Sequence, residues 1–529
     1  MRHFNVLIIG AGAVGNAIAR EVSKNNTISV AVLEKEPDAA FGISGRNSGV
    51  LHAGFNNKPG SLMAKLCVQG SESFKEQAEA LGIEFKKTGK LVIARYQEDL
   101  ERLNKLKEQG EANGVRELRI IGRKEIERLL GYDAGVAALW SGMTGIFDPF
   151  EYTIALAEAA FAQGTEFFFG RWVTDIKIQN RLINMQSANH QPGQYADLNQ
   201  FNNIENSCNS DNNCNSDNCF IVTAENRLMG SQETFQTDIL INCAGLYADE
   251  INQMLGLNDY KIFPCRGEYH ILDKNESKGS VLPVYPIPNE RDGGLGVHLT
   301  PTIGGNLMIG PSAEYLSPGQ EREDYSTTLE VMERLSIEGI ELFPGLNSKA
   351  YIRSFSGVRP KLVSEEEGGY SDFVIEKCKQ VSGFIRLIGI ESPGLTASIP
   401  IGRMVAGMVE GMLQGEKMLI DKNSAKQPDA HKIFTLKHKR DRGDKKMLCR
   451  CEGITGEAVL SAFDRILEIG AIPTIKGIKN RTRVTMGNCQ GSFCALNIVE
   501  LLQKKRQVDP MRLLWNGFGS YMFEGSVRK

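Results

Sequence analysis

Four cysteines near the C-terminus fall into two close pairs, Cys449 with Cys451 and Cys489 with Cys494. Four thiolates that come together in space can bind a structural zinc ion or a [2Fe–2S] cluster, and paired spacing lets two short turns present them to one site. Zinc knuckles usually separate the two cysteines of a pair by two residues, and neither pair does so. The spacing therefore favours an iron–sulfur cluster, with zinc as the alternative.

A glycine-rich turn near the N-terminus is the second candidate for chemistry. Gly10, Gly12 and Gly15 follow a continuous apolar run at 6–9 and precede a helical pattern, and a second apolar run ends in Glu34. In such a fingerprint Gly10 permits a tight turn, Gly12 lets the backbone approach a pyrophosphate, and Gly15 allows close helix–strand packing. Glu34 can accept hydrogen bonds from a ribose diol. The N-terminus therefore predicts a Rossmann-type dinucleotide site, for either FAD or NAD.

The composition narrows the class of protein. The chain has 529 residues, of which 41% are hydrophobic, so it can bury a large core and form more than one domain. A net charge of -3 and a pI near 6.3 give no reason to expect nucleic acid or an anionic membrane as a partner. We expect no secretion signal, because Met1 to Phe4 leads directly into an apolar strand, and no transmembrane segment. The cytoplasm is then the expected compartment, and its reducing conditions favour ligand thiols over disulfides.

Four further segments resemble one known superfamily. They are the Gly/Ser/Asn-rich loop 41–54, which carries His52, and the segments 238–249, 356–360 and 389–396. In this order they are similar to the D-amino-acid-oxidase-like superfamily, in the branch that contains FAD-dependent glycerol-3-phosphate dehydrogenases and L-2-hydroxyglutarate oxidases. The resemblance implies FAD rather than NAD. It also implies an α/β fold, with a Rossmann-like FAD-binding domain and an α+β substrate domain on a mixed sheet.

The resemblance assigns cofactor contacts residue by residue. The segment 389–396 matches the family's closing FAD motif, where a helix N-terminus lies near the flavin pyrimidine and its oriented amides stabilise negative charge. Val173 matches a backbone contact to adenine. The implied FAD-binding residues are Gly10, Gly12, Gly15, Glu34, Arg46, Asn47, Ser48, Val173, Ala244, Gly245, Gly389, Glu391, Pro393, Gly394, Leu395 and Thr396.

The C-terminal cysteines resemble a second family. Their C-x-C … C-x4-C pattern is similar to the bacterioferritin-associated-ferredoxin-like [2Fe–2S] domain that is fused to anaerobic glycerol-3-phosphate dehydrogenases and to amine or opine oxidases. The resemblance implies a small helical domain in which Cys449, Cys451, Cys489 and Cys494 are the metal ligands. It also implies a protein electron acceptor, either a second flavoprotein subunit or a ferredoxin-like carrier, as the partner.

The substrate side requires a base for a hydroxyl proton and cations for an anionic substrate. His52 is the candidate base, because imidazole titrates near neutrality and the family places this histidine over the flavin; a structural histidine is the alternative. Arg359 would hold a phosphate or carboxylate in a forked geometry. Arg266 and Arg353 are weaker candidates, since each could equally belong to a structural ion pair. His298 is expected on the same face, with a structural role equally open.

The domain organisation follows from these landmarks. We expect an FAD-dependent oxidoreductase at 1–412, a basic linker at 413–447 and the [2Fe–2S] domain at 448–529. Within the first, FAD-binding segments are predicted at about 1–70, 150–180, 220–260 and 355–412, and substrate-domain segments at about 71–149 and 261–354. Strands are expected at 90–95, 267–272 and 296–308, charged helical structure at 100–130, and a disordered Asn/Ser-rich insert at 187–219.

The sequence favours one reaction and leaves two alternatives. The favoured function is oxidation of sn-glycerol 3-phosphate to dihydroxyacetone phosphate, by hydride transfer to flavin N5 with electrons leaving through the cluster. The first alternative is oxidation of L-2-hydroxyglutarate, which is also a small dianion with a secondary hydroxyl. The second belongs to another class, a non-catalytic FAD/iron–sulfur subunit that only transfers electrons.

Overall fold

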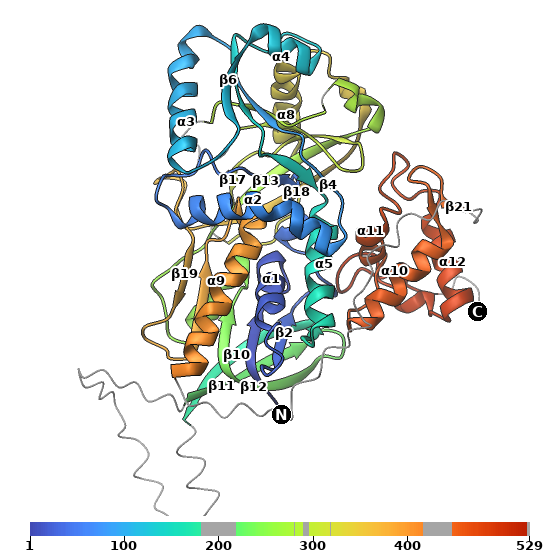
Figure 1. Ribbon diagram of the computed structural model, residues 1–529. Helices are drawn as coiled ribbons and strands as arrows, with labels where there is room; N and C mark the ends of the chain where they lie inside the picture. Colours follow the sequence, from blue (N-terminus) through green and yellow to red (C-terminus); the bar gives the residue numbers. More distant parts are fainter. Residues whose placement is uncertain (181–217, 280, 289–295, 318, 416–446, 526–529) are drawn as a thin grey trace, which may run out of the picture.

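Two large sheets and a separate C-terminal domain make up the architecture, seen in a computed structural model (Figure 1). The structure describes residues 1–180, 218–279, 281–288, 296–317, 319–415 and 447–525. The first sheet, with helices α1, α5 and α9, forms the lower half of the view, and the second sheet lies above it. The C-terminal helices stand beside the first sheet. The predicted α/β fold, with a mixed second sheet and a helical C-terminal domain, is confirmed.

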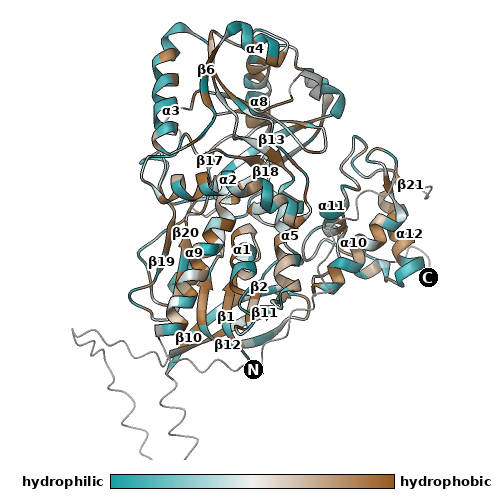
Figure 2. Ribbon diagram, viewed as in Figure 1, coloured by the Kyte–Doolittle hydropathy of each residue, from teal (hydrophilic) through white to brown (hydrophobic). Residues whose placement is uncertain are grey.

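The first sheet is built around β1 (Arg2–Ile9). Its parallel neighbours are β2 (Val30–Glu34) and β12 (Ser231–Asn242), and the sheet continues to β9 (Glu166–Phe169) on one side and β20 (Phe384–Ile388) on the other. Residues 6–9 of β1 and 30–33 of β2 are continuous apolar runs because both faces of the sheet are covered there. Figure 2 shows these hydrophobic strands behind the helices.

Three helices cover one face of this sheet (Figure 1). α1 (Ala13–Val22) packs against α5 (Pro149–Ala162) and α9 (Gly394–Gly415). The α1–α9 crossing is close, since a Cβ at Gly402 would lie 2.7 Å from the Ala17 carbonyl oxygen. The N-terminal ends of α1 and α9 are thereby brought to the same edge of the sheet.

An antiparallel hairpin extends the sheet beyond β12. It consists of β10 (Arg171–Asn180) and β11 (Asn218–Asn226), while β19 (Val374–Lys377) pairs with β20. Residues 181–217, which include most of the predicted insert, lie outside the described residues. The prediction is wrong at its C-terminal end: Cys219 is a buried residue of β11 and accepts a hydrogen bond from Gln236 Nε2 at 3.2 Å. The apolar neighbours of Cys219 along β11 explain this, since they bury it in the sheet.

The second sheet is mixed, as expected, with only β5 and β14 running parallel. Two predictions of secondary structure need correction. The expected helical region at 100–130 contains α3 (Leu100–Ala112) and α4 (Arg123–Leu130), but Gly114, at φ +80°, ends the first helix and a strand separates the two. The expected strand at 296–308 is a hairpin.

The strands of the second sheet follow one another in space in this order: β6 (Leu118–Gly122), β7 (Ala137–Ser141), β5 (Lys90–Ala94), β14 (Val284–Pro286), β15 (His298–Pro301), β16 (Leu307–Gly310) and β13 (Phe263–Leu272). Strands β18 (Tyr351–Lys361) and β17 (Glu314–Tyr315) also pair with β13.

Helix α2 (Leu62–Leu81) packs against α9 where the two sheets meet. Ser61 caps its N-terminus by accepting a hydrogen bond from the Ala64 N–H at 3.1 Å. A Cβ at Gly70 would lie 2.1 Å from the Thr396 carbonyl oxygen, so this glycine lets α2 lie directly against the start of α9. A small sheet of β3 (Val50–Leu51), β8 (Gly145–Phe147) and β4 (Phe85–Lys86) lies beside the helix. Helix α8 (Leu329–Leu342) packs on the second sheet.

The C-terminal domain contains three helices and a short hairpin. Strands β21 (Met447–Cys449) and β22 (Ile454–Thr455) precede α10 (Gly456–Glu468), and α11 (Ile475–Thr482) and α12 (Ala495–Arg506) follow. The sequence indicated α10 and α12 but not α11. Most of the predicted basic linker, residues 416–446, lies outside the described residues.

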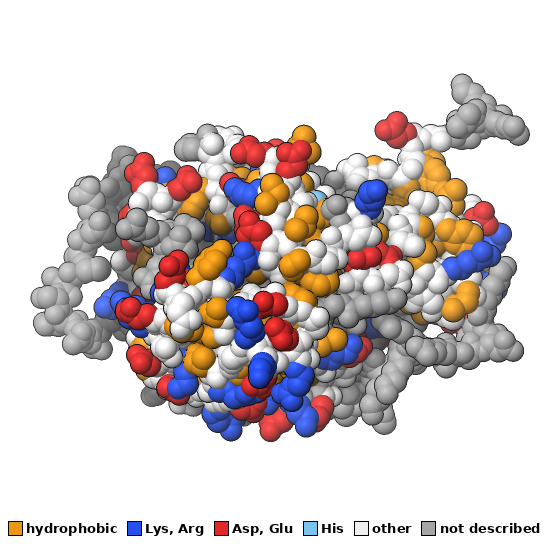
Figure 3. Space-filling model, turned by 90° about the horizontal axis from the view of Figure 1, so that it is seen from above, with side chains coloured by type: hydrophobic (Ala, Val, Ile, Leu, Met, Phe, Trp, Pro, Cys, Tyr) orange, Lys and Arg blue, Asp and Glu red, His pale blue; other side chains and the backbone are white. Residues whose placement is uncertain are grey.

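Figure 3 shows acidic and basic side chains interspersed over the face seen from above. Within the described ranges, no helix is both long and apolar enough to cross a lipid bilayer.

Candidate active site

The glycine-rich turn connects β1 to α1 at the edge of a large cavity lined by residues of both halves of the chain. Gly10 adopts φ +108°, and a Cβ there would lie 2.5 Å from the Cys243 carbonyl oxygen. A Cβ at Gly15 would lie 2.0 Å from the Gly10 carbonyl oxygen. Gly12 lines the cavity at the start of the helix, where the helix N-terminus favours an anion. The turn therefore has room for a pyrophosphate, but no side chain could be added at Gly10 or Gly15.

Glu34 ends β2 at the same edge and lines the cavity. Its carboxylate accepts hydrogen bonds from the Ala11 N–H at 2.7 Å and the Glu36 N–H at 2.9 Å. Burial, with the nearby charge of Glu36, raises the pKa of Glu34 to about 7. The carboxylate is held in place by backbone groups and faces the position expected for a ribose.

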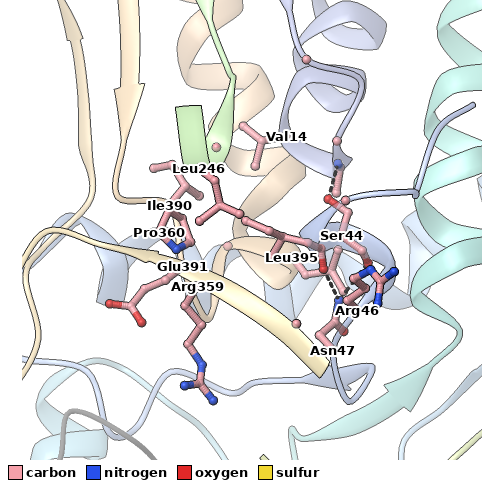
Figure 4. Close-up of a pocket in the computed structure, with 18 of the residues that line it drawn as sticks. Val14, Ser44, Arg46, Asn47, Leu246, Arg359, Pro360, Ile390, Glu391 and Leu395 are labelled. Carbon is pink, nitrogen blue, oxygen red and sulfur yellow. Dashed lines mark hydrogen bonds between the residues drawn. The ribbon is translucent and has the colours of Figure 1, made fainter. Parts of the chain in front are cut away.

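The loop after β2 forms one wall of the cavity (Figure 4). Ser44 Oγ accepts a hydrogen bond from the Ala13 N–H at 2.9 Å, which fixes the loop to the first turn of α1. Asn47 Nδ2 donates to the Ser44 carbonyl oxygen at 2.8 Å, and Arg46 donates to the Ser356 carbonyl oxygen at 3.1 Å. Ser48 also lines the cavity. These hydrogen bonds keep the loop on the wall of the cavity, so the space for a cofactor stays open.

The remaining predicted cofactor residues lie along the same cavity, with one exception. Val173 of β10 and the turn Ala244–Gly245 after β12 line one end, and the N-terminal residues of α9 line the other. Gly389 does not line the cavity; at φ +68° it turns the chain after β20, and a Cβ there would lie 2.5 Å from Leu362. The predicted residues at this end of the cavity are Glu391 and Pro393, which precede α9, and Gly394, Leu395 and Thr396 in its first turn.

Two predicted substrate-side histidines face this cavity. The His52 backbone N–H donates to Thr396 Oγ1 at 3.1 Å, and His52 Nε2 lies 3.3 Å from Ser392 Oγ. Burial holds the pKa of His52 well below its usual value, so the imidazole is neutral at physiological pH. His298 Nδ1 lies 2.9 Å from the Gly296 carbonyl oxygen, while its buried Nε2 has no hydrogen-bond partner. Burial lowers the pKa of His298 to about 3.

Of the three predicted arginines, the structure brings only Arg359 to the cavity. Its side chain extends away from Val14 and the glycine turn (Figure 4) and donates to the Ser312 carbonyl oxygen at 3.0 Å. Among the described residues it forms no ion pair with a carboxylate, so its charge is available for an anion.

The other two arginines lie elsewhere. Arg266 forms ion pairs with Glu268 at 3.1 Å and Asp324 at 2.7 Å. It therefore belongs to a structural ion pair, which the sequence had allowed as the alternative to substrate binding. Arg353 donates to Gln490 Oε1 at 3.2 Å, next to Cys489 in the C-terminal domain. Neither side chain lines the cavity.

Sequence reasoning missed an aromatic and cationic layer behind the histidines. Tyr285 lines the cavity and stacks on His298, with ring centroids 3.8 Å apart. Tyr269 and Tyr370 also line it. Lys90 lies beneath Tyr285, with Nζ 4.1 Å from the ring centroid. No sequence pattern distinguishes these residues, because Lys90 and Tyr285 read as ordinary strand residues.

The four C-terminal cysteines gather as two contacting pairs. Cys451 Sγ lies 3.6 Å from Cys489 Sγ on the exposed side, and the thiol of Cys494 contacts that of Cys449 in the interior. In the described part of the chain, no three acidic, cysteine or histidine side chains converge as needed to hold one metal ion. Two pairs of thiols match a [2Fe–2S] cluster, which takes two thiolates at each iron.

The C-terminal domain is docked on the first sheet by buried ion pairs. Arg481 of α11 pairs with Asp38 and lies 3.5 Å from Glu158, and all three side chains are at most 1% exposed. Arg465 also pairs with Glu158, at 2.6 Å. Lys476 lies 4.2 Å from the ring centroid of Phe41, which lines the cavity. The thiol-bearing domain therefore contacts the wall of the cofactor cavity directly.

The chain matches the FAD dependent oxidoreductase family over residues 5–197 and 214–408. It belongs to this family. Residues 447–504 match the BFD-like [2Fe-2S] binding domain. FAD and a [2Fe–2S] cluster are thus the cofactors of this FAD-dependent oxidoreductase, and the open glycine turn, the Glu34 carboxylate and the two thiol pairs fit them.

Three relatives illustrate the similarity. A glycerol 3-phosphate dehydrogenase of Caloramator mitchellensis is 33% identical over 540 residues, which cover 99% of both chains. The mitochondrial L-2-hydroxyglutarate dehydrogenase of Homo sapiens is 30% identical over 442 residues, covering 77% of this chain and 89% of the human one. The structure of L-α-glycerophosphate oxidase from Mycoplasma pneumoniae, with FAD bound, aligns with a TM-score of 0.64 and 26% identity over 78% of this chain and 95% of that one.

Proposed function

We propose that this FAD-dependent dehydrogenase oxidises sn-glycerol 3-phosphate to dihydroxyacetone phosphate in the cytoplasm and passes the electrons to a protein acceptor. The observation that carries the proposal is the placement of His52 and Arg359 on one cavity beside the N-terminus of α9. The relative named for this substrate also spans both the family domain and the cysteine module.

Different residues of the cavity bind the substrate and accept its proton in the proposed reaction. Arg359 binds the anionic end of the substrate, because its guanidinium lines the cavity and forms no ion pair with a carboxylate of the described residues. His52, neutral at physiological pH, accepts the proton of the substrate's secondary hydroxyl at Nε2. Ser392 Oγ lies 3.3 Å from that nitrogen, and the substrate's hydroxyl would take its place there. Bound FAD supplies the hydride acceptor.

The electrons are proposed to leave through the C-terminal cluster. The domain that carries the thiols is fixed against the cavity wall by the Arg481–Asp38 pair, and Cys451 is the exposed thiol. The buried pair, Cys449 and Cys494, thus faces the interior of the protein. The pair Cys451 and Cys489 faces solvent, where a one-electron carrier can approach. The cluster supplies this one-electron route.

L-2-hydroxyglutarate is the second candidate substrate. The relatives with that name are about as similar over the family domain, at 30% identity for the human protein. Both candidates are small dianions with a secondary hydroxyl, so Arg359 and His52 would serve either.

Anaerobic bleaching of the flavin tests the proposal. We expect sn-glycerol 3-phosphate to bleach it at least tenfold faster than L-2-hydroxyglutarate at equal concentration. The reverse order would replace the proposed substrate, and no bleaching by either would favour the electron-transfer subunit that has no substrate of its own. Cys451→Ser should leave the bleaching intact but abolish reduction of cytochrome c, used as a one-electron acceptor. Unchanged cytochrome reduction would refute the cluster as the exit.

A further inference from the structure

A turn near the end of the chain, residues 515–520, packs against the FAD-binding sheet. Its own hydrogen bonds fix its shape, since the Trp515 N–H donates to the Ser520 carbonyl oxygen at 2.7 Å and the Ser520 N–H donates to the Gly517 carbonyl oxygen at 3.2 Å. The Lys476 N–H donates to the Trp515 carbonyl oxygen at 2.9 Å and attaches the turn to the start of α11. The turn lies beyond residues 447–504, which match the [2Fe-2S] family, so binding of the cluster does not explain its position.

Phe518 of this turn contacts the connection between β9 and β10. Gly170 in that connection has φ +73°, and a Cβ there would lie 2.8 Å from Phe518 Cζ and 3.1 Å from Ile472 Cδ1. The Gly170 N–H donates to the Glu36 carbonyl oxygen at 3.0 Å, which joins the connection to the segment after β2. Phe518 therefore packs directly on the backbone from which β10 begins.

Arg227, which follows β11, links Phe518 to the cavity. Its backbone N–H donates to the Gly170 carbonyl oxygen at 2.8 Å. Its guanidinium carbon lies 4.9 Å from the ring centroid of Phe518 and 5.7 Å from that of Trp172. A guanidinium plane packs well on aromatic rings. Trp172 lines the cavity and precedes Val173, so a continuous set of contacts runs from the C-terminal domain to the cavity wall.

Trp172 stands where the adenosine half of FAD is expected. Its ring meets that of Tyr247, which also lines the cavity, edge to face with centroids 5.2 Å apart. Lys35 Nζ lies 5.4 Å from the centroid of Trp172 and 5.2 Å from that of Tyr247. Lys35 directly follows Glu34, the carboxylate that faces the expected ribose. These neighbours place Trp172 at the adenosine end of the cavity.

We propose that the C-terminal domain completes the adenosine end of the FAD site, with Phe518 as a positioning residue that holds Trp172 in place through Arg227. A ring that is already fixed in one orientation loses less side-chain entropy when it binds a flat base than a ring that is free to turn. Retention of FAD then depends on the domain that carries the cluster thiols. The proposal needs only that FAD binds in this cavity, whichever alcohol is the substrate.

Release of FAD from the holoprotein tests the role of Phe518. Flavin fluorescence after dilution reports the dissociation rate, and we expect Phe518→Ala to release FAD about fivefold faster than the wild type. Tyr521→Ala is the control, because it removes an aromatic side chain of the same tail that is 53% exposed, and it should release FAD at the wild-type rate. A wild-type rate in Phe518→Ala would overturn the proposal.

Substitutions at Arg227 test the link between the two rings. Arg227→Met should also release FAD about fivefold faster, and adding Phe518→Ala to it should change the rate by less than about twofold, because both residues act through one set of contacts. Arg227→Lys separates ring contact from the ion pair that Arg227 forms with Glu36 at 3.8 Å. We expect it to behave like Arg227→Met, since lysine lacks the guanidinium plane. Multiplicative effects in the double variant, or a wild-type rate in Arg227→Lys, would contradict the link.

A comparison of FAD with FMN separates this role from general support of the fold. FMN lacks the adenosine half, so Phe518→Ala should weaken FAD about fivefold but change the affinity for FMN by less than about twofold. The measurement is titration of the full-length protein after removal of its flavin. Equal losses for the two flavins would show that Phe518 only stabilises the fold. Neither flavin titration involves a substrate, so the result is independent of whether sn-glycerol 3-phosphate is oxidised.

Discussion

Arg481 donates hydrogen bonds to both carboxylate oxygens of Asp38, which lies 443 positions earlier in the sequence. The pair joins helix α11 of the cysteine domain to the loop that follows β2, and both side chains are at most 1% exposed. A buried ion pair is costly to break from one side, because the remaining charge loses its partner.

Asp38→Ala should therefore loosen the docking of the C-terminal domain. We expect the free energy of unfolding to fall by about 3 kcal/mol, since Glu158 remains near Arg481 at 3.5 Å and compensates only in part. The measurement is chemical denaturation of the holoprotein. Asp464→Ala is the matched control, because it removes the partner of Arg506 at the surface and should cost less than about 1 kcal/mol. Equal effects of the two substitutions would contradict a docking role for Asp38.

Gly15→Ala should abolish tight FAD binding. The new methyl group would lie 2.0 Å from the Gly10 carbonyl oxygen, so the turn that faces the pyrophosphate would have to move. We expect purified Gly15→Ala to contain less than about a tenth of the wild-type flavin per protein, measured by absorbance. Gly407→Ala is the control, because it lies in α9 with open space around the added methyl group and should gain up to about 1 kcal/mol in stability. Full flavin content in Gly15→Ala would contradict the assigned turn.

The affinity for FAD should depend on pH through Glu34. The pKa of its carboxyl is raised to about 7, so protonation below that pH converts a hydrogen-bond acceptor for the ribose into a donor. FAD should therefore bind more weakly as the pH falls, by roughly tenfold between pH 8 and pH 6. The dissociation constant can be measured by quenching of flavin fluorescence. Glu34→Gln should remove this dependence and the exposed Glu410→Gln should retain it; parallel pH profiles for all three proteins would rule out the role of Glu34.

His52→Ala should slow flavin reduction by about a hundredfold without a comparable loss of FAD. The reason is that the imidazole of His52 is neutral and that its Nε2 would exchange Ser392 Oγ for the substrate's hydroxyl as hydrogen-bond partner. Stopped-flow reduction is the measurement, and added imidazole should restore part of the rate because it can occupy the vacated space. His3→Ala, at the protein surface, is the control. A rate within about threefold of the wild type would reduce His52 to a structural residue.

The parts of the site that the sequence predicted are those with local causes. The turn from Gly10 to Gly15 and the acid at Glu34 follow from strand, glycine and helix patterns that lie within one βαβ unit. The helices α10 and α12 follow from their apolar periodicity in the same way. Such features need no knowledge of distant contacts.

The features that the sequence left open depend on partners far along the chain. Arg266 and Arg353 resembled the substrate-binding arginine in type, but Asp324 and Gln490 determine where they point. Arg227 is distinguished only by the rings of Trp172 and Phe518 that its guanidinium contacts, and no sequence pattern records those contacts. Gly70 matters because Thr396 lies against it.

The central position of β1 in the first sheet has a consequence for biosynthesis. β1 precedes both of these segments in the chain: its neighbour β12 ends at Asn242, and the cavity wall at Thr396 comes later still. A nascent chain therefore leaves one edge of β1 without its partner until β12 has left the ribosome. The flavin cavity is complete only when α9 has been made, and the cysteine domain, which follows α9 in the chain, contacts the loop at Asp38. The complete set of cavity walls therefore exists only after α9 has been made, so the topology of the chain sets the earliest point at which flavin can be fully enclosed.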